Sequence, residues 1–90
     1  MIRQPEETVE ADVLALRALF WTLAEPARAQ RLLAVTGIEP EGLRARVGDP
    51  AVLAATLQFL LANEADLVEC AADLGVRPPA LARAAAALDA

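Results

Sequence analysis

The strongest constraint on the fold is the stretch 49–63, the longest run of this chain without an internal charge. Asp49 and Pro50 suit the start of a helix, because aspartate accepts a hydrogen bond from a free amide and proline fits the first helical position. Six large apolar residues follow at helical spacing and cover an arc of roughly 200°: Val52, Leu53, Leu57, Phe59, Leu60 and Leu61. The sequence therefore predicts a central, mostly buried helix over 49–63.

The composition favours an all-α fold around this helix. The chain has 90 residues, of which 57% are hydrophobic and only 3% aromatic, and helix-forming residues dominate. Its single cysteine, Cys70, leaves no disulfide within the chain to support so small a domain. We predict a compact bundle of five or six short helices in one domain over 8–90, after a frayed N-terminal segment, 1–7.

Prolines and glycines mark the predicted helix boundaries. Pro26, Pro40 and Pro78 suit helix starts, and Gly37 and Gly75 suit left-handed caps at helix ends. The predicted helices span about 7–24, 26–36, 40–47, 49–63, 63–75 and 78–88.

Two local predictions refine this scheme. Asn63 can cap the fifth helix with Asp66 as its reciprocal partner, and Gly48 can close the third. The first helix carries one apolar face at helical spacing, which we expect to pack in the bundle: Val9, Val13, Leu16, Leu19, Phe20 and Leu23.

A repeat of 38 residues relates the two halves of the chain. Both contain the phrase Gly-(Ile/Val)-x-Pro-x-x-Leu, at 37–43 and 75–81. This match predicts two copies of a three-helix unit, over about 11–48 and 49–86. Chance matches in an Ala/Leu-rich chain are the alternative.

The two halves differ in charge at equivalent positions. Arg28 and Arg31 in the first correspond to Asp66 and Glu69 in the second. If the units pack about a pseudo-twofold axis, one side of the domain is basic and the other acidic. Two solvated faces are the favoured interpretation, and self-association or a partner recognised through opposite patches is the alternative.

The sequence offers little for catalysis or metal binding. It contains no His, Ser, Lys or Tyr, which removes the usual proton shuttle and most nucleophile–base pairs. Asp66, Glu69 and Asp73 share a helical face, but without histidine they are best interpreted as a solvated acidic face. The same carboxylates disfavour a thiolate at Cys70, a predicted buried small hydrophobe. We expect no enzyme, cofactor or metal.

A candidate interaction patch lies at one edge of the first helix and consists of Leu14, Arg17 and Trp21. Arg17 stands four residues from Trp21 and could stack on its ring. Packing at the rim of the bundle is the favoured interpretation. The functional alternative is an exposed aromatic and arginine patch of the kind that anchors protein interfaces.

A helix-turn-helix pattern around Gly75 is the main sign of another function. Leu74 and Leu81 fit the apolar positions that hold two helices at an angle. The outward positions of the second helix offer only Arg77 and Arg83, with no amide side chain to read bases. The net charge of −5 also opposes DNA binding, so nucleic acid is an unlikely partner.

Two phrases resemble a family of small alphaproteobacterial proteins that is a domain of unknown function. They are LAVTGIEPEGLR at 33–44 and DPAVLAATLQFLLANE at 49–64, followed by Gly75-Val76-x-Pro78. The resemblance covers roughly 13–88 and implies a compact helical cytoplasmic domain. It carries over no catalytic residue.

These observations favour a small cytoplasmic protein-interaction or accessory module without chemistry of its own. The N-terminus lacks the layout of a signal peptide, and no uncharged run reaches the roughly 18 residues of a membrane helix. The expected partner is another protein or a second copy of the chain. The alternative function is a helix-turn-helix-like DNA-binding protein.

Overall fold

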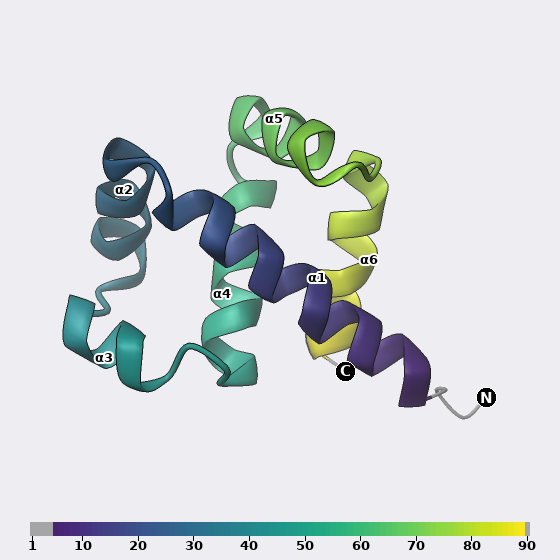
Figure 1. The fold of residues 1–90 in the computed structure, drawn as a ribbon, viewed down its shortest axis with the longest axis horizontal. Helices are drawn as coiled ribbons and strands as arrows, with labels where there is room; N and C mark the ends of the chain where they lie inside the picture. Colours follow the sequence, from purple (N-terminus) through teal and green to yellow (C-terminus); the bar gives the residue numbers. More distant parts are fainter. Residues whose placement is uncertain (1–4, 90) are drawn as a thin grey trace.

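Residues 5–89 form a bundle of six α-helices, which confirms the predicted all-α class (Figure 1). The computed structural model describes residues 5–89, and side chains from residue 10 onward. The helices are α1 (Pro5–Leu23), α2 (Pro26–Thr36), α3 (Pro40–Ala45), α4 (Pro50–Leu61), α5 (Glu64–Leu74) and α6 (Pro78–Asp89). Helix α1 starts two to three residues before the predicted position, and the part of the predicted frayed segment at 1–4 lies outside the described residues.

Proline and acidic caps start the helices largely as predicted. Asp49 Oδ1 accepts a hydrogen bond of 2.8 Å from the Ala51 amide, and Pro50 takes the first position of α4. Glu25 caps α2 in the same way through two backbone amides. These backbone hydrogen bonds favour the ionised carboxylates, and they are the main reason why the pKa of both groups lies below its ordinary value.

The predicted cap of α5 is wrong. Asn63 makes no side-chain cap hydrogen bond, and the reciprocal bond is blocked because the Asn63 amide already donates to the Leu60 carbonyl at 3.0 Å. The carboxylate of Asp66 is directed at Arg31 instead.

The left-handed glycine caps are confirmed, but the third helix is shorter than predicted. Gly37 and Gly75 have φ angles of 73° and 74° and end α2 and α5. A side chain at either position would be strained, since L-residues rarely adopt this conformation. Helix α3 ends at Ala45, with Arg46 rather than Gly48 at its C-cap.

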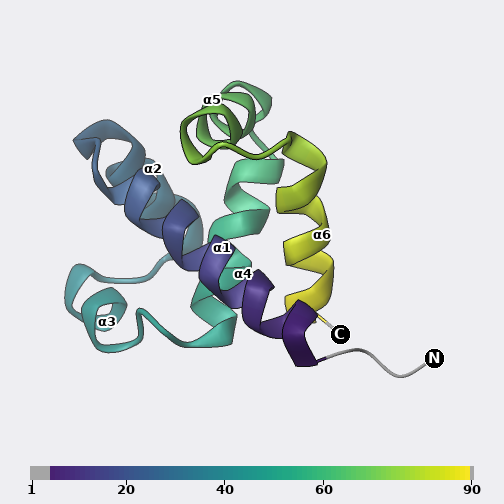
Figure 2. The ribbon, with the colours of Figure 1, turned by 45° about the vertical axis from the view of Figure 1, so that its right-hand side comes forward.

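The core lies where α1, α4 and α6 pack against one another (Figures 1 and 2). Helix α1 crosses α4, and α6 runs beside α4 and packs against both helices. Helix α4 is the central, mostly buried helix that the sequence predicts. Its buried residues are Val52, Leu53, Thr56, Leu57, Phe59 and Leu60.

The inner face of α1 differs from the predicted one. It consists of small residues and one leucine: Ala11, Ala15, Ala18, Leu19 and Thr22. Small side chains let the α4 and α6 backbones approach α1 closely, and the Thr22 hydroxyl donates to the Ala18 carbonyl at 2.8 Å. Of the predicted buried face, Leu19 is inside, whereas Val13 and Phe20 are 54% and 55% exposed.

The 38-residue repeat remains a prediction for the chain as a whole. Leu19 and its equivalent Leu57 are both fully buried, and Gly37 and Gly75 share one conformation. The third helices differ, because α6 packs along α1 and α4 whereas α3 forms none of the larger helix–helix contacts.

Leu57→Ala should destabilise the domain severely. Leu57 is fully buried in the central helix, and a Leu→Ala change in a core costs about 2–5 kcal/mol of unfolding free energy. A urea titration followed by circular dichroism measures this loss, with Val35→Ala as the control because Val35 is 71% exposed. A midpoint for Leu57→Ala close to that of the wild type would contradict the central position of α4.

Candidate functional site

The predicted patch residues are engaged with other parts of the same chain. The Trp21 indole nitrogen donates a hydrogen bond of 2.7 Å to Asp73 Oδ2 on α5. The cation over its ring is Arg28, 3.6 Å from the ring centroid, and not Arg17 as predicted. Arg17 instead donates to the Leu74 carbonyl at 2.9 Å. Trp21 and Arg17 therefore fasten α5 to α1.

The third residue of the predicted patch lies elsewhere on α1. Leu14 is half-buried and borders a hollow against α6, together with Ala80 and Ala84. The structure thus brings Trp21 and Arg17 to α5 and Leu14 to α6, and these three side chains do not form one continuous apolar surface.

The favoured interpretation of two solvated charged faces is wrong for Arg31 and Asp66. Arg31 Nη1 lies 3.0 Å from Asp66 Oδ2 and joins α2 to α5. Asp66 is buried rather than solvated, whereas Glu69 is exposed. Arg28 packs on Trp21. Opposite charges from the two halves therefore meet inside one molecule.

The Trp21–Asp73 hydrogen bond should contribute a measurable part of the stability. Asp73 is exposed, so we expect a coupling free energy of about 0.5–1.5 kcal/mol, below that of a buried bond to a charged group. A double-mutant cycle of Trp21→Phe and Asp73→Ala in urea isolates this coupling from effects on each helix alone. Additive single effects would show that the bond stabilises nothing.

No metal centre or reactive thiol is formed by the described part of the chain. Residues 5–89 contain no group of three or more His, Cys, Asp or Glu side chains placed to hold a metal ion. Cys70 is fully buried, and this burial raises the pKa of its thiol to about 11. The thiol therefore stays protonated near neutral pH.

The raised pKa of Cys70 predicts a loss of stability in alkali. The unfolded chain ionises its thiol near pH 9.0, and the folded protein does so only near pH 11. Between these values the folded state binds more protons, so the free energy of unfolding falls as pH rises from about 9 to 11. Urea titrations at pH 8 and 10.5 should show a decrease for the wild type that is smaller for Cys70→Ala. Equal decreases would contradict the assignment.

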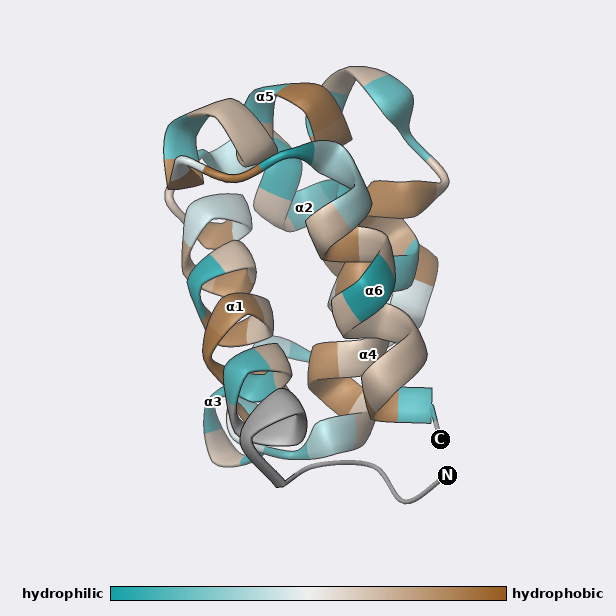
Figure 3. Cartoon of the chain, turned by 90° about the vertical axis from the view of Figure 1, so that its right-hand side faces the viewer, coloured by the Kyte–Doolittle hydropathy of each residue, from teal (hydrophilic) through white to brown (hydrophobic). Residues whose placement is uncertain are grey.

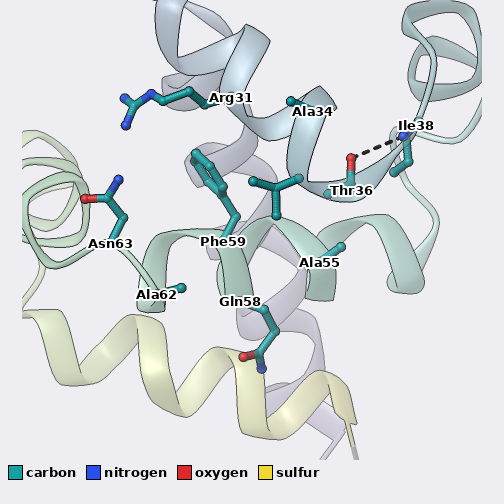
Figure 4. Close-up of a pocket in the computed structure, with 10 residues that line it drawn as sticks. Arg31, Ala34, Thr36, Ile38, Ala55, Gln58, Phe59, Ala62 and Asn63 are labelled. Atoms are coloured by element: carbon teal, nitrogen blue, oxygen red, sulfur yellow. Dashed lines mark hydrogen bonds between the residues drawn. The ribbon is translucent and has the colours of Figure 1, made fainter.

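An open, mainly apolar groove of about 590 Å³ lies between α2 and α4 (Figure 4). Its lining comes from both helices and the segments that follow them: Arg31, Ala34, Val35, Thr36, Ile38, Ala55, Gln58, Phe59, Ala62 and Asn63. Phe59 points from α4 toward α2, and Val35 is 71% exposed. We call this feature the α2/α4 groove.

Polar groups occur mainly at the two ends of the α2/α4 groove. Arg31, paired with Asp66, lies at one end. At the other end Thr36 donates its hydroxyl to the Leu32 carbonyl and accepts the Ile38 amide at 3.3 Å. Between them the lining is apolar except for Gln58, and it includes no nucleophile or base.

The sequence interpretation did not single out this groove. The available signal was the run of Leu32, Leu33, Ala34 and Val35 in α2. The side chains of four consecutive helical residues are directed to all sides of the helix. Packing on one side of α2 therefore cannot bury all four. Only Leu32 is fully inside.

The helix pair around Gly75 is present as α5 and α6. Helix α6 turns Leu81, Ala84 and Ala85 into the core. Arg77 and Arg83 are exposed. These are the only basic side chains of this pair, as the sequence already indicates.

The fold and the α2/α4 groove define a small all-helical module with an open apolar groove. The chain belongs to the DUF3572 family, described as a protein of unknown function, whose family model matches residues 8–90. This match confirms the resemblance to a domain of unknown function. Comparisons with curated proteins and with solved structures gave no match.

One further property of the helices concerns membranes. Across residues 5–89 no individual helix combines the length and apolar character needed to cross a membrane. Helices α4 and α5 meet that criterion only together, as a pair bent by 114°.

Proposed function

We propose that this chain is a non-catalytic interaction module that binds an amphipathic helix of a partner protein in the α2/α4 groove. The observation that carries this proposal is Val35, which is 71% exposed beside an apolar groove of about 590 Å³. An apolar groove with an exposed valine at its edge offers continuous apolar surface that a docked side chain can cover.

The shape of the groove supports a helical partner. Ala55, Phe59 and Ala62 follow one another at spacings of four and three and therefore lie on one face of α4. The two alanines leave room on either side of Phe59 for apolar side chains of a docked helix. A partner with apolar residues at i, i+4 and i+7 fits this spacing.

The charge around the groove supports a partner with acidic flanks. Arg31 is the one charged residue among those that line the groove, in a chain whose total charge is −5. Arg31 borders the groove and contacts Asp66 through Nη1. Its side chain is 46% exposed, so further guanidinium donors are accessible to a carboxylate of the partner.

The chemical inventory supports the non-catalytic part of the proposal. The sequence has no His, Ser, Lys or Tyr, and burial keeps Cys70 protonated. The same proposal places the protein in the cytoplasm of an alphaproteobacterium. The support for that location is the sequence resemblance around 33–44 and 49–64.

Val35→Asp should weaken partner binding about 30-fold while the fold is kept. A charge at the centre of an apolar contact should reduce the binding free energy by about 2 kcal/mol, the contribution of one hot-spot residue, which is about 30-fold in affinity. The measurement is affinity purification from the native cell after crosslinking, followed by hydrogen exchange of the purified complex. Binding should protect amides of 31–38 and 55–63.

Val68→Asp is the matched control. Val68 is 51% exposed on α5 and does not border the groove. The proposal requires a partner that is retained by Val68→Asp and lost by Val35→Asp. Capture that survives Val35→Asp, or protection confined to other helices, would overturn it.

A further inference from the structure

A second hollow lies where α3 and the turn after it meet α1 and α2. Its volume is about 390 Å³. Figures 1 and 2 both show α2 and α3 together on the side of the molecule away from α6. Six apolar residues from α1, α2, α3 and the turn form its walls: Phe20, Leu23, Leu33, Pro40, Leu43 and Val47. We call this feature the α3 hollow.

The walls of the α3 hollow retain apolar surface that the fold does not bury. Helix α3 has six residues, of which only Leu43 is buried. On the other walls Leu23 and Leu33 are half-buried, and Phe20 is 55% exposed. Figure 3 shows strongly hydrophobic residues in the middle of α1. An apolar ligand in the hollow would therefore remove both its own surface and that of the walls from water.

The α3 hollow is separate from the α2/α4 groove, since no residue lines both. Leu33 lines the hollow and Val35 lines the groove, so the two features lie on different sides of α2. Their polar groups differ as well. The groove has hydroxyl and amide side chains in its lining, whereas the lining of the hollow has none.

Arg44 is the one polar residue that lines the α3 hollow. It is exposed, and its side chain forms no ion pair or hydrogen bond with any described residue. Four other arginines donate to a partner within the fold: Arg17, Arg28, Arg31 and Arg46. An arginine stem lies on apolar surface while its guanidinium stays in water. The mouth of the hollow therefore has one available cation.

This combination suits a ligand with an apolar body and one anionic end. A polar body would lose its hydrogen bonds to water against apolar walls, whereas a guanidinium binds a carboxylate through two parallel hydrogen bonds. The volume of about 390 Å³ is near the lower end of the range for ligand pockets. At the roughly 30 Å³ that one water takes up, it holds roughly 13 non-hydrogen atoms.

We propose that the α3 hollow binds a medium-chain fatty acid, with the alkyl chain against the apolar walls and the carboxylate on Arg44. No other lining residue carries a charge, so Arg44 determines the sign of the head group. The net charge of −5 favours a singly charged carboxylate over a doubly charged phosphate ester. This proposal concerns another site than the α2/α4 groove and does not depend on helix binding there.

Calorimetric titration of the full chain with decanoate, below its micelle concentration, tests the proposal. We expect a dissociation constant on the order of 100 µM for a ligand of about 12 non-hydrogen atoms. Decyltrimethylammonium has the same alkyl chain and the opposite charge, and it should bind at least tenfold more weakly. In an NMR titration, decanoate should shift the methyl resonances of Leu33, Leu43 and Val47 and leave those of Val35 and Val68 unchanged.

Substitutions at exposed positions test the two parts of the site. Arg44→Gln should weaken decanoate binding at least tenfold, and Arg77→Gln is the matched control because Arg77 is exposed outside the hollow. Phe20→Glu places a carboxylate on the apolar wall and should also weaken binding at least tenfold. Both variants should keep the helical circular dichroism of the wild type, because Phe20 and Arg44 are exposed.

The absence of decanoate binding at about 1 mM would overturn the proposal. So would equal affinities for decanoate and decyltrimethylammonium, an affinity that Arg44→Gln leaves unchanged, or methyl shifts centred on Val35. A protein partner that Phe20→Glu loses, found together with an absence of decanoate binding, would make the α3 hollow a protein-docking site instead.

Discussion

Close contact between α1 and its two neighbours, α4 and α6, is the constraint on which the rest of the structure depends. It is possible because the inner face of α1 is built from Ala11, Ala15, Ala18 and Thr22 around one leucine. Small side chains bring helix backbones together and keep many favourable van der Waals contacts in a thin interface. The same choice leaves the larger apolar residues of α1 outside, where they form a surface.

The two remaining long helices, α2 and α5, are held to this centre differently. Helix α2 buries only Leu32 completely, and α5 is tied by the Trp21 and Arg17 hydrogen bonds and by the Arg31–Asp66 ion pair. Hydrogen bonds and an ion pair therefore hold these helices in place in part, whereas apolar burial holds the central helices together. Helix α2 stands partly away from α4, and the α2/α4 groove is the space between them.

The sequence predicts those parts of the fold that depend on local chemistry. Asp49 with Pro50 and the glycines at 37 and 75 specify helix boundaries through their own backbone preferences, and the apolar arc of 49–63 identifies the central helix. It does not predict which of two apolar faces of α1 turns inward, because that choice depends on the fit against α4 and α6. The sequence does not predict the pairing of Arg31 with Asp66 for the same reason, since these residues meet only in the folded chain. Nor does it predict the exposure of Val35, which depends on α2 turning Leu32 inward.

The caps at both ends of α2 have a mechanical consequence. Glu25 and Pro26 fix its first turn, and Gly37 in the left-handed conformation fixes its last. Because both ends are secured by local contacts, the length of α2 does not depend on its contacts to α4. The position of α2 beside the neighbouring groove is set instead by contacts between helices, among them the Arg31–Asp66 ion pair to α5 and the packing of Arg28 on Trp21 of α1.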